Sequence, residues 1–251
     1  MKKIMEHKLS DSQAAIWWLG QAGYVLRVNG LTVVIDPYLS DSGANGAPEF
    51  NRLYPAPITP DALKADIIII THNHADHLDP ETIAPYRYKD ETWFVAPWLA
   101  AAALVKAGVA SERIIVVNAG QTHKVALAEI TGVFALPTGT DVLDTTGYLV
   151  KFENGRSIYH TSDTQFHPLV VDAAPASPDI MLVPINGKWG NPGPEQAALF
   201  TASVKPKFVF PNHYDTMALN AENPEVFKWF CEKKGLESKC IIAERMVPFT
   251  W

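Results

Sequence analysis

The sequence predicts an α/β protein in which sheets are covered by helices and each half of the chain contains a β-hairpin. Two similar stretches, residues 23–37 and 147–164, lead to this prediction. Each has a β-branched and aromatic run, an Asn-Gly pair, a second such run and an aspartate near its end. Short apolar runs and helix-start patterns alternate along the rest of the chain, which favours layers of sheet and helix.

The Asn-Gly pairs predict tight hairpin turns at residues 29–30 and 154–155. Asparagine and glycine both accept the positive φ angles that a type I′ turn requires. Because the two pairs lie about half a chain apart, they indicate a duplicated β-rich unit.

Two proline-led patterns predict helix starts. Residues 79–81 (Asp-Pro-Glu) and 223–225 (Asn-Pro-Glu) each place a capping side chain before a proline and an acidic residue. The helix that follows the second pattern is expected to stop at Gly235. Two more helices are expected at 97–106 and 194–203. Buried strands are expected at 66–70, 114–117, 179–183 and 207–210.

The composition is that of a globular protein, with 251 residues of which 47% are hydrophobic and 19% are charged. No Gly-rich or Ser-rich linker divides the chain, so we expect one domain that spans residues 1–251. The net charge of −6 and the scattered lysines and arginines provide no basic face for a phosphate backbone. We therefore expect a small-molecule partner and no nucleic acid, while the formation of a homo-oligomer stays open.

Three features favour a cytoplasmic protein without a membrane segment. Charged residues interrupt the N-terminal stretch where a signal peptide would have its apolar core. The most apolar stretch, residues 93–105, contains a proline and is shorter than the ~20 residues of a spanning helix. The two cysteines, Cys231 and Cys240, form no CxxC pair, which suits a reducing compartment.

The stretch THNHADH at residues 71–77 predicts a metal site. It directly follows a buried strand and offers four candidate ligands, which are His72, His74, Asp76 and His77. Imidazole and carboxylate are ligands that suit zinc, manganese and iron. A single histidine at a strand end is usually structural, but four such side chains within six residues of a turn can converge on one ion.

The sequence HNHADH after a buried strand resembles the signature of the metallo-β-lactamase superfamily. This resemblance implies a four-layer αββα sandwich with the metal site at one edge of the two sheets. TSDT at 161–164 is similar to a later aspartate motif of that superfamily, which makes Asp163 the bridging carboxylate. PNHYDT at 211–216 is similar to its final histidine motif, which adds His213 as a ligand.

Within the superfamily the chain most resembles the L-ascorbate-6-phosphate lactonase group. The resemblance implies a lactonase, although the chain is shorter than a full member of that group and the substrate need not carry over. The matching stretches are IWWLGQAGYVLRVNG, ADIIIITHNHADHLD, SIYHTSD, VKPKFVFPNHYD and the terminal VPFTW.

One ligand of the dinuclear pattern is missing. Dinuclear members have a third histidine on a loop that here reads FALPTGTD, residues 134–141, and Thr140 or Asp141 stands in its place. The first metal position is then left with His72, His74 and Asp163. The second has Asp76, His77, Asp163 and His213. We expect one or two zinc or manganese ions per chain.

Other residues near these motifs have open roles. His160 is expected in the core or behind a metal ligand, where it would orient that ligand. His167 lies four residues after Asp163 and is a candidate to face the pocket and bind substrate. The loop at 184–190 offers Asn186, Lys188 and Trp189, which suit sugar and phosphate binding, but an ordinary connection explains the same residues.

The ligand set predicts hydrolysis in which a metal-bound hydroxide attacks a substrate carbonyl and Asp76 orients the water or relays its proton. A sugar-derived or phosphorylated lactone is the expected substrate. Alternatives are a phospholipase-D-like phosphodiesterase, a thioesterase or β-lactamase, and a non-catalytic metal-containing binding protein.

Overall fold

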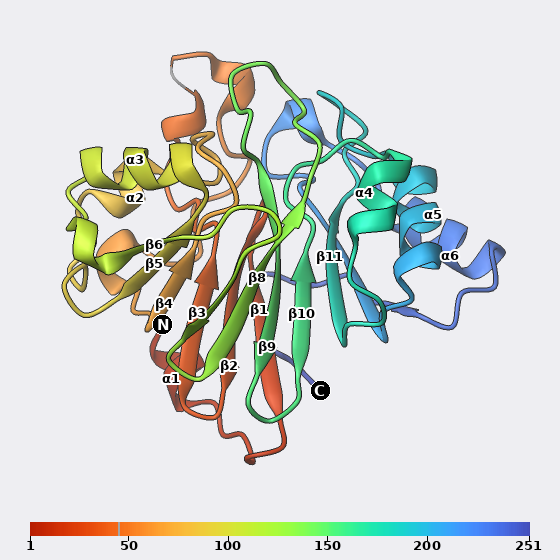
Figure 1. Cartoon of the computed structure of the whole chain (residues 1–251). Coiled ribbons are helices and arrows are strands. Elements are labelled where there is room, and N and C mark those ends of the chain that lie inside the picture. The colour runs from red at the N-terminus through yellow and green to blue at the C-terminus, as the bar shows by residue number, and fades with distance from the viewer. Residues whose placement is uncertain (45) are drawn as a thin grey trace.

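Two mixed β-sheets packed face to face form the centre of the computed structural model (Figure 1), which describes residues 1–44 and 46–251. The first sheet has the strand order β14-β1-β2-β3-β4-β5-β6, and the second has the order β13-β12-β11-β10-β9-β8-β7. Strands of the first sheet are β1 (Ala14–Gly20), β2 (Gly23–Val28), β3 (Leu31–Ile35), β4 (Ile67–Ile69), β5 (Trp93–Ala96), β6 (Ile114–Val116) and β14 (Phe249–Thr250). Strands of the second are β7 (Thr122–Val125), β8 (Ala128–Phe134), β9 (Thr146–Phe152), β10 (Ser157–His160), β11 (Ile180–Pro184), β12 (Phe208–Asn212) and β13 (Lys239–Cys240).

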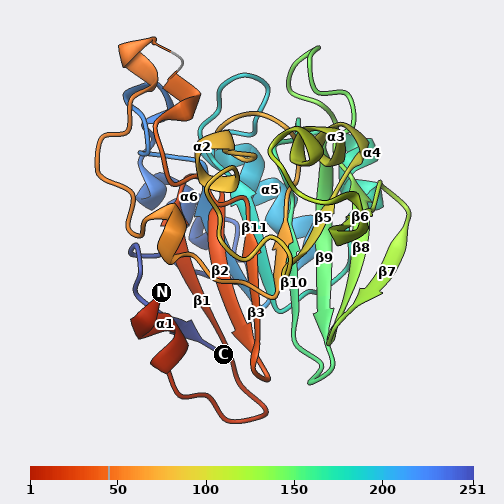
Figure 2. The same ribbon diagram turned by 90° about the vertical axis from the view of Figure 1, so that its left-hand side faces the viewer.

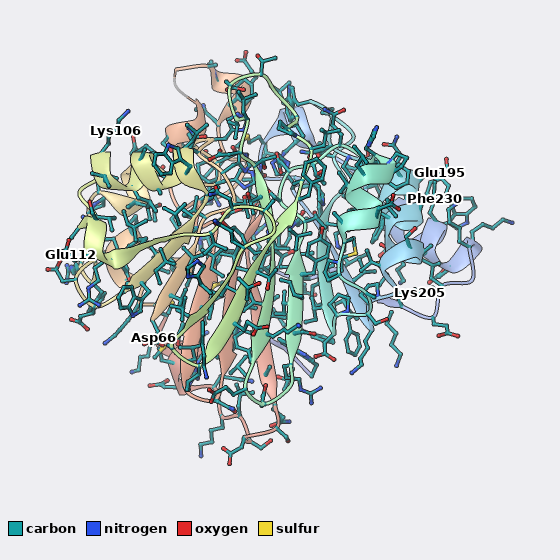
Figure 3. The ribbon with its side chains drawn as sticks, in the orientation of Figure 1. Asp66, Lys106, Glu112, Glu195, Lys205 and Phe230 are labelled. Atoms are coloured by element: carbon teal, nitrogen blue, oxygen red, sulfur yellow. The ribbon has the colours of Figure 1, made fainter. Side chains whose placement is uncertain are left out.

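Helices cover the outer face of each sheet, so the chain forms the expected four-layer αββα sandwich (Figures 1 and 2). The first sheet carries α1 (Lys2–Glu6), α2 (Pro80–Ile83) and α3 (Trp98–Lys106); the second carries α4 (Pro168–Ala173), α5 (Pro194–Val204) and α6 (Pro224–Lys233). In Figure 3, Lys106 and Glu112 lie on one side of the molecule, whereas Glu195 and Phe230 lie on the other. Short 3₁₀ helices occur at Ser42–Ala44, Pro48–Phe50, Pro60–Ala62, Ser111–Arg113 and Ala218–Asn220.

The isoleucine run of β4 shows why a strand in this position must be apolar throughout. Ile67 and Ile69 belong to the core between the two sheets, while Ile68 and Ile70 pack against the helices outside. Successive side chains of a strand point to opposite faces. A strand with both faces covered therefore reads as an unbroken apolar run.

Both halves of the chain repeat one strand arrangement. In the first half β2 pairs antiparallel with β3, and β3 pairs parallel with β4. In the second half β9 pairs antiparallel with β10, and β10 pairs parallel with β11. The duplicated hairpin unit expected from the sequence is confirmed.

The two hairpin turns differ, and the prediction of a type I′ turn is wrong for the second. Asn29 and Gly30 both have positive φ, at 50° and 78°. In the second hairpin only Gly155 does, because the connection is longer. The Gly155 amide donates to the Phe152 carbonyl at 2.9 Å, so Asn154 is the second central residue of a turn over 152–155 and Gly155 follows that turn.

The remaining expected elements are confirmed, with ends shifted by one or two residues. Asp79 and Asn223 cap their helices by accepting hydrogen bonds from Glu81 and Glu225. The apolar stretch at 93–105 is divided by Pro97 into β5 and most of α3. No helix within the described residues is long and apolar enough to cross a membrane.

The fold brings the three candidate metal motifs to one edge. Residues 71–77 follow β4, Asp163 follows β10 and His213 follows β12, and these strands end on the same side of the sandwich. Loops at the carboxyl ends of parallel strands form the usual place for a site in such sheets.

A buried hydrogen bond between the sheets provides a test of this packing. The Tyr148 hydroxyl on β9 donates to the carbonyl of Val117, just after β6, at 2.8 Å. We expect Tyr148→Phe to lower the free energy of unfolding by about 1–2 kcal/mol, because the buried carbonyl loses its partner. Denaturant unfolding at fixed metal content measures the change.

Tyr159→Phe is the matched control. Tyr159 is equally buried, but its hydroxyl has no hydrogen-bond partner among the described residues. Removing that hydroxyl should leave stability unchanged or raise it slightly. Equal losses in the two variants would contradict this account of the interface.

Candidate metal centre

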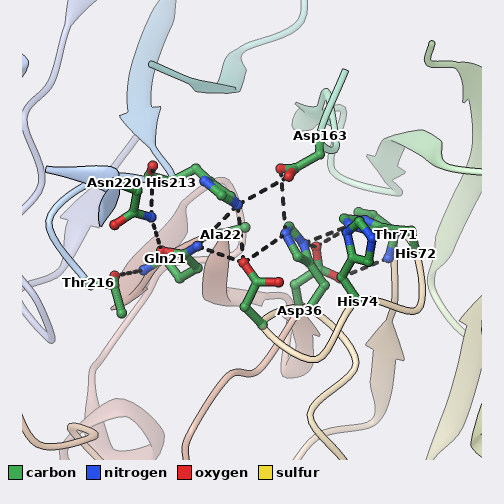
Figure 4. A network of polar contacts seen from close by, with 12 residues as sticks. Gln21, Ala22, Asp36, Thr71, His72, His74, Asp163, His213, Thr216 and Asn220 are labelled. Carbon is green, nitrogen blue, oxygen red and sulfur yellow. Dashed lines mark hydrogen bonds and ion pairs between the residues drawn. The ribbon is translucent and has the colours of Figure 1, made fainter. Parts of the chain in front are cut away.

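Asp76, His77, Asp163 and His213 meet at the edge of the sandwich. Figure 4 shows Asp163 and His213 joined by one of these contacts. His213 Nε2 lies 3.2 Å from Asp163 Oδ2 and 3.3 Å from Asp76 Oδ2. His77 Nε2 lies 3.5 Å from Asp163 Oδ1 and 3.6 Å from Asp76 Oδ2. Two imidazoles and two carboxylates thus surround one small volume.

The predicted ligands form two overlapping groups. The donor atoms of His72, His77 and Asp163 lie within 4.8 Å of one another, and so do those of Asp76, His77 and His213. His74 was expected beside His72 and Asp163 in the first group but belongs to neither. Its Nδ1 lies 3.0 Å from His72 Nε2, and its Nε2 is turned outward to Asp141.

Asp36 orients His77 and was missed as a site residue. Its Oδ2 lies 2.7 Å from His77 Nδ1 and accepts from the Thr71 hydroxyl at 2.7 Å, while Oδ1 accepts from the Thr71 amide at 2.8 Å. His77 therefore donates through Nδ1 and turns Nε2 to the carboxylates. Asp36 stands at the end of the first hairpin as Asp163 stands near the end of the second. This similarity in the sequence could have identified Asp36 as a site residue.

Gln21 and Asn220 form a second supporting network that was also missed (Figure 4). The Gln21 side-chain amide donates to Asp76 Oδ2 at 2.7 Å, and its carbonyl accepts from Asn220 at 2.9 Å. The Gln21 backbone amide donates to Thr216 Oγ1 at 2.8 Å. Neutral amides are not metal-type side chains, so the sequence did not mark them.

The electrostatics of the site separate the histidines. Burial, and then the charge on His77, lower the pKa of His72 to about 3, so this imidazole is neutral. Burial alone would lower the pKa of His213, but the carboxylates of Asp163 and Asp76 outweigh it and raise the pKa to about 9. Burial likewise opposes protonation of His77, yet Asp76, Asp163 and Asp36 raise its pKa well above the usual value.

The carboxylates show the reciprocal effect. Burial would raise the pKa of Asp76 and of Asp163, but the positive charges of His77 and His213 dominate and hold both values well below the ordinary range. Both groups are therefore anionic and can bind a cation.

The structure distinguishes the two candidates for the missing third ligand. Asp141 Oδ2 lies 3.2 Å from His74 Nε2, and its carboxylate is 71% exposed. Thr140 is exposed, and its side chain makes no hydrogen bond within the described residues. Of the two candidates, Asp141 is thus the one that contacts His74, and it does so at the ring nitrogen that is turned away from His72.

His160 and His167 have structural contacts. His160 Nε2 donates to the carbonyl of Ala22 at 3.0 Å, and its Nδ1 accepts from the Ser162 amide at 3.0 Å, which secures the turn before Asp163. Burial, as the largest cause, lowers the pKa of His160. His167 caps α4 by accepting from the Leu169 amide and is exposed.

A pocket of about 290 Å³ opens over the cluster. Of the residues expected to bind substrate, Trp189 lines it, whereas His167, Asn186 and Lys188 are not among its lining residues. Asn186 is buried without a hydrogen-bond partner in the described chain, and the Lys188 ammonium donates to the Leu219 carbonyl. Lining residues are Gln21, Gly43, Phe50, His74, Ala75, Asp76, Thr138, Asp163, Trp189, His213, Met217 and Asn220.

The donor atoms fit a divalent metal ion. His77 Nε2 is fully buried and has no hydrogen-bond partner among the described residues, although it faces two carboxylates. Buried polar atoms without a partner are rare in folded proteins. Imidazole nitrogen and carboxylate oxygen together suit zinc-type and manganese-type ions.

Sequence comparison finds relatives along most of the chain. A family model described as a beta-lactamase superfamily domain matches residues 15–213. A UPF0173 metal-dependent hydrolase of Methanopyrus kandleri is 30% identical over 238 residues, which cover 91% of this chain and 96% of the relative. A second UPF0173 metal-dependent hydrolase, from Hyperthermus butylicus, is 31% identical over 228 residues, which cover 90% of this chain and 94% of the relative. Neither is named as an L-ascorbate-6-phosphate lactonase, so that likeness stays a prediction.

Solved structures share the fold. The metallo hydrolase Igni18 of Ignicoccus hospitalis superimposes with a TM-score of 0.75 at 24% identity and covers 95% of this chain and 98% of its own. An isothiocyanate hydrolase from Delia radicum gut bacteria also superimposes with a TM-score of 0.75, at 18% identity, and the match covers 94% of this chain and 98% of that protein. With the αββα fold and the matched family model, these findings show that the chain belongs to the metallo-β-lactamase superfamily.

Proposed function

We propose that the chain is a metal-dependent hydrolase that opens a lactone or a related ester at the carbonyl. The observation that supports this proposal is the pair of overlapping ligand groups at the floor of a small-molecule pocket. The names of the relatives, metal-dependent hydrolases, agree with it. A pocket of about 290 Å³ suits a small molecule rather than a polymer.

We assign six residues, together with Asp141, as the ligands of one or two divalent ions, which are zinc or manganese. The second position takes Asp76, His77, Asp163 and His213. The first takes His72, Asp163 and His74, which would bind through the Nδ1 that lies 3.0 Å from His72 Nε2. The Asp141 carboxylate beside His74 is our candidate for the ligand that lacks a histidine. A bound ion in such a site lowers the pKa of a water ligand and polarises a carbonyl oxygen.

The protein side chains have separate tasks in this reaction. Asp36 keeps the His77 ring in one orientation, and Gln21 keeps the Asp76 carboxylate facing His213. When only one ion binds, Asp76 is free to accept the proton of the attacking water. The pocket walls hold the substrate carbonyl above these groups.

Elemental analysis of the purified protein, followed by a screen of lactones, phosphodiesters and thioesters, tests the proposal. Turnover of lactones or simple esters supports it. Preferential cleavage of phosphodiesters would instead identify a phosphodiesterase, and bound metal without turnover of any class would identify a binding protein.

We expect Asp163→Asn to remove hydrolysis and most of the bound metal while the protein stays folded. The change keeps the shape of the side chain but removes the charge shared by both positions. Mutation of a residue that hydrogen-bonds a metal ligand typically lowers metal affinity or activity by about 10–100-fold. Loss of a ligand itself should therefore lower kcat/KM by at least roughly a hundredfold. Metal content, activity and circular dichroism measure the outcome.

His123→Ala, on the exposed part of β7, is the control for this prediction. Full activity with full metal content in Asp163→Asn would refute the ligand assignment.

The exposed carboxylate of Asp141 should make the first position the weaker one. We expect zinc titration calorimetry to show one tight and one weaker ion, because a mobile carboxylate binds zinc less firmly than an imidazole. Asp141→Ala should further weaken binding of the weaker ion, the one at the first position, and Asp141→His should strengthen it. Thr140→Ala is the neighbouring control and should change neither. Two equal tight sites in the unmodified protein would contradict this expectation.

Metal binding should release protons in a pH-dependent manner. With a pKa of about 9, His213 carries a proton at neutral pH in the metal-free protein and must lose it to coordinate zinc. The number of protons released per ion should therefore fall as the pH rises through 9, and zinc affinity should rise up to that pH. Calorimetry in two buffers of different ionisation enthalpy measures both. Release that increases with pH would show that His213 is not the source.

A further inference from the structure

One wall of the pocket is apolar and aromatic. Phe50 ends the 3₁₀ helix Pro48–Phe50, and Trp189 lies on a loop far away in the sequence. Their ring centroids lie 6.3 Å apart at an angle of 30°. Met217 lines the same pocket. The candidate ligands Asp76, Asp163 and His213 line the same pocket, which has a volume of about 290 Å³. Aromatic rings in such a position gain most by covering an apolar group.

The loop that carries Trp189 holds the ring at the pocket at a conformational cost. Trp189 has φ of +53°, and Gly187 and Gly190 also have positive φ. Residues other than glycine rarely adopt this region, because their Cβ crowds the backbone. Two backbone hydrogen bonds hold the turn, from Gly187 to the Pro192 carbonyl at 3.2 Å and from Asn191 to the Lys188 carbonyl at 2.9 Å. Trp189 is nevertheless 48% exposed, so the turn leaves the ring at the pocket surface and does not bury it in the core.

The pocket offers an anionic group no positive side chain besides the metal ligands. Among the described lining residues there is no lysine or arginine. Lys188, which precedes Trp189, directs its ammonium to the Leu219 carbonyl. The Asp141 carboxylate, which contacts the lining residue His74, is negative. A phosphate or carboxylate on the substrate would therefore meet no lysine or arginine among these lining residues.

We infer, building on the proposed hydrolase function, that the substrate is a small uncharged lactone or ester with an apolar substituent. Trp189 and Phe50 cover that substituent and determine specificity. Gln21, Thr138 and Asn220 line the same pocket and provide neutral polar contacts.

Three δ-lactones test the inference with the zinc-loaded full chain: unsubstituted δ-valerolactone, δ-nonalactone with its alkyl tail, and the 6-phosphate of glucono-δ-lactone. We expect kcat/KM for δ-nonalactone to exceed that for δ-valerolactone by roughly tenfold or more, since a buried alkyl group gives discrimination of this size. The phosphorylated lactone should be the poorest. Trp189→Ala should remove most of the preference for the alkyl tail, with a smaller loss on δ-valerolactone.

Trp229→Ala is the matched control, because Trp229 is similarly exposed but lies on α6, away from the pocket. It should keep the full preference. A preference for the phosphorylated lactone that disappears in Lys188→Met would overturn the inference. Equal loss on all three lactones in Trp189→Ala would also overturn it, because the ring would then have no role in selectivity.

Binding separates failure of this inference from failure of the proposed function. If no lactone is hydrolysed, the lactam analogue of δ-nonalactone is titrated into the zinc-loaded protein by calorimetry. Binding that weakens about tenfold in Trp189→Ala supports an apolar pocket while the hydrolase proposal fails. Absence of binding to the unmodified protein, or binding that Trp189→Ala leaves unchanged, contradicts the inference itself.

Discussion

The buried hydrogen bond between Asp36 and His77 is the contact on which the site depends. Both side chains are inaccessible to solvent, and 2.7 Å separates Asp36 Oδ2 from His77 Nδ1. A buried pair of this kind adds little net stability, but removing one partner costs about 3–5 kcal/mol because the other charge is left unpaired. The contact connects the end of β3 to the loop after β4, and it selects the His77 ring nitrogen that faces Asp76 and Asp163.

The cluster exists only because the two halves of the molecule pack together. The first half contributes residues 72–77, and the second contributes Asp163 and His213. The inner faces of both sheets share one continuous apolar core, in which Ile67 and Ile69 meet residues of the second sheet such as Tyr148 and Val150. Packing of this core brings the strand ends together, so the geometry of the candidate metal ligands follows from burial of apolar surface far from them.

Backbone conformation aims the side chains once the strands have been placed. Gln21, Asp36, Ser162 and His213 all have positive φ, between 43° and 62°, and each lies where a strand has just ended. Residues other than glycine rarely occupy this region, and they persist there when surrounding contacts hold them. In this site those contacts are the hydrogen bonds of Asp36, Gln21 and His160. The turns redirect the chain so that the ligands face one another.

The sequence by itself determined the elements and the kinds of ligand. Apolar runs, proline-led helix caps and the hairpin pairs are local patterns, and four ligands within residues 72–77 are close in space because they are close in the chain. Only the tertiary structure decided which distant side chains support them. Asp36, Gln21 and Asn220 meet the ligands across long separations, and no local spacing encodes such contacts. For the same reason only the fold distinguished Asp141 from Thr140, and only the fold turned Trp189 into the pocket and Lys188 away from it.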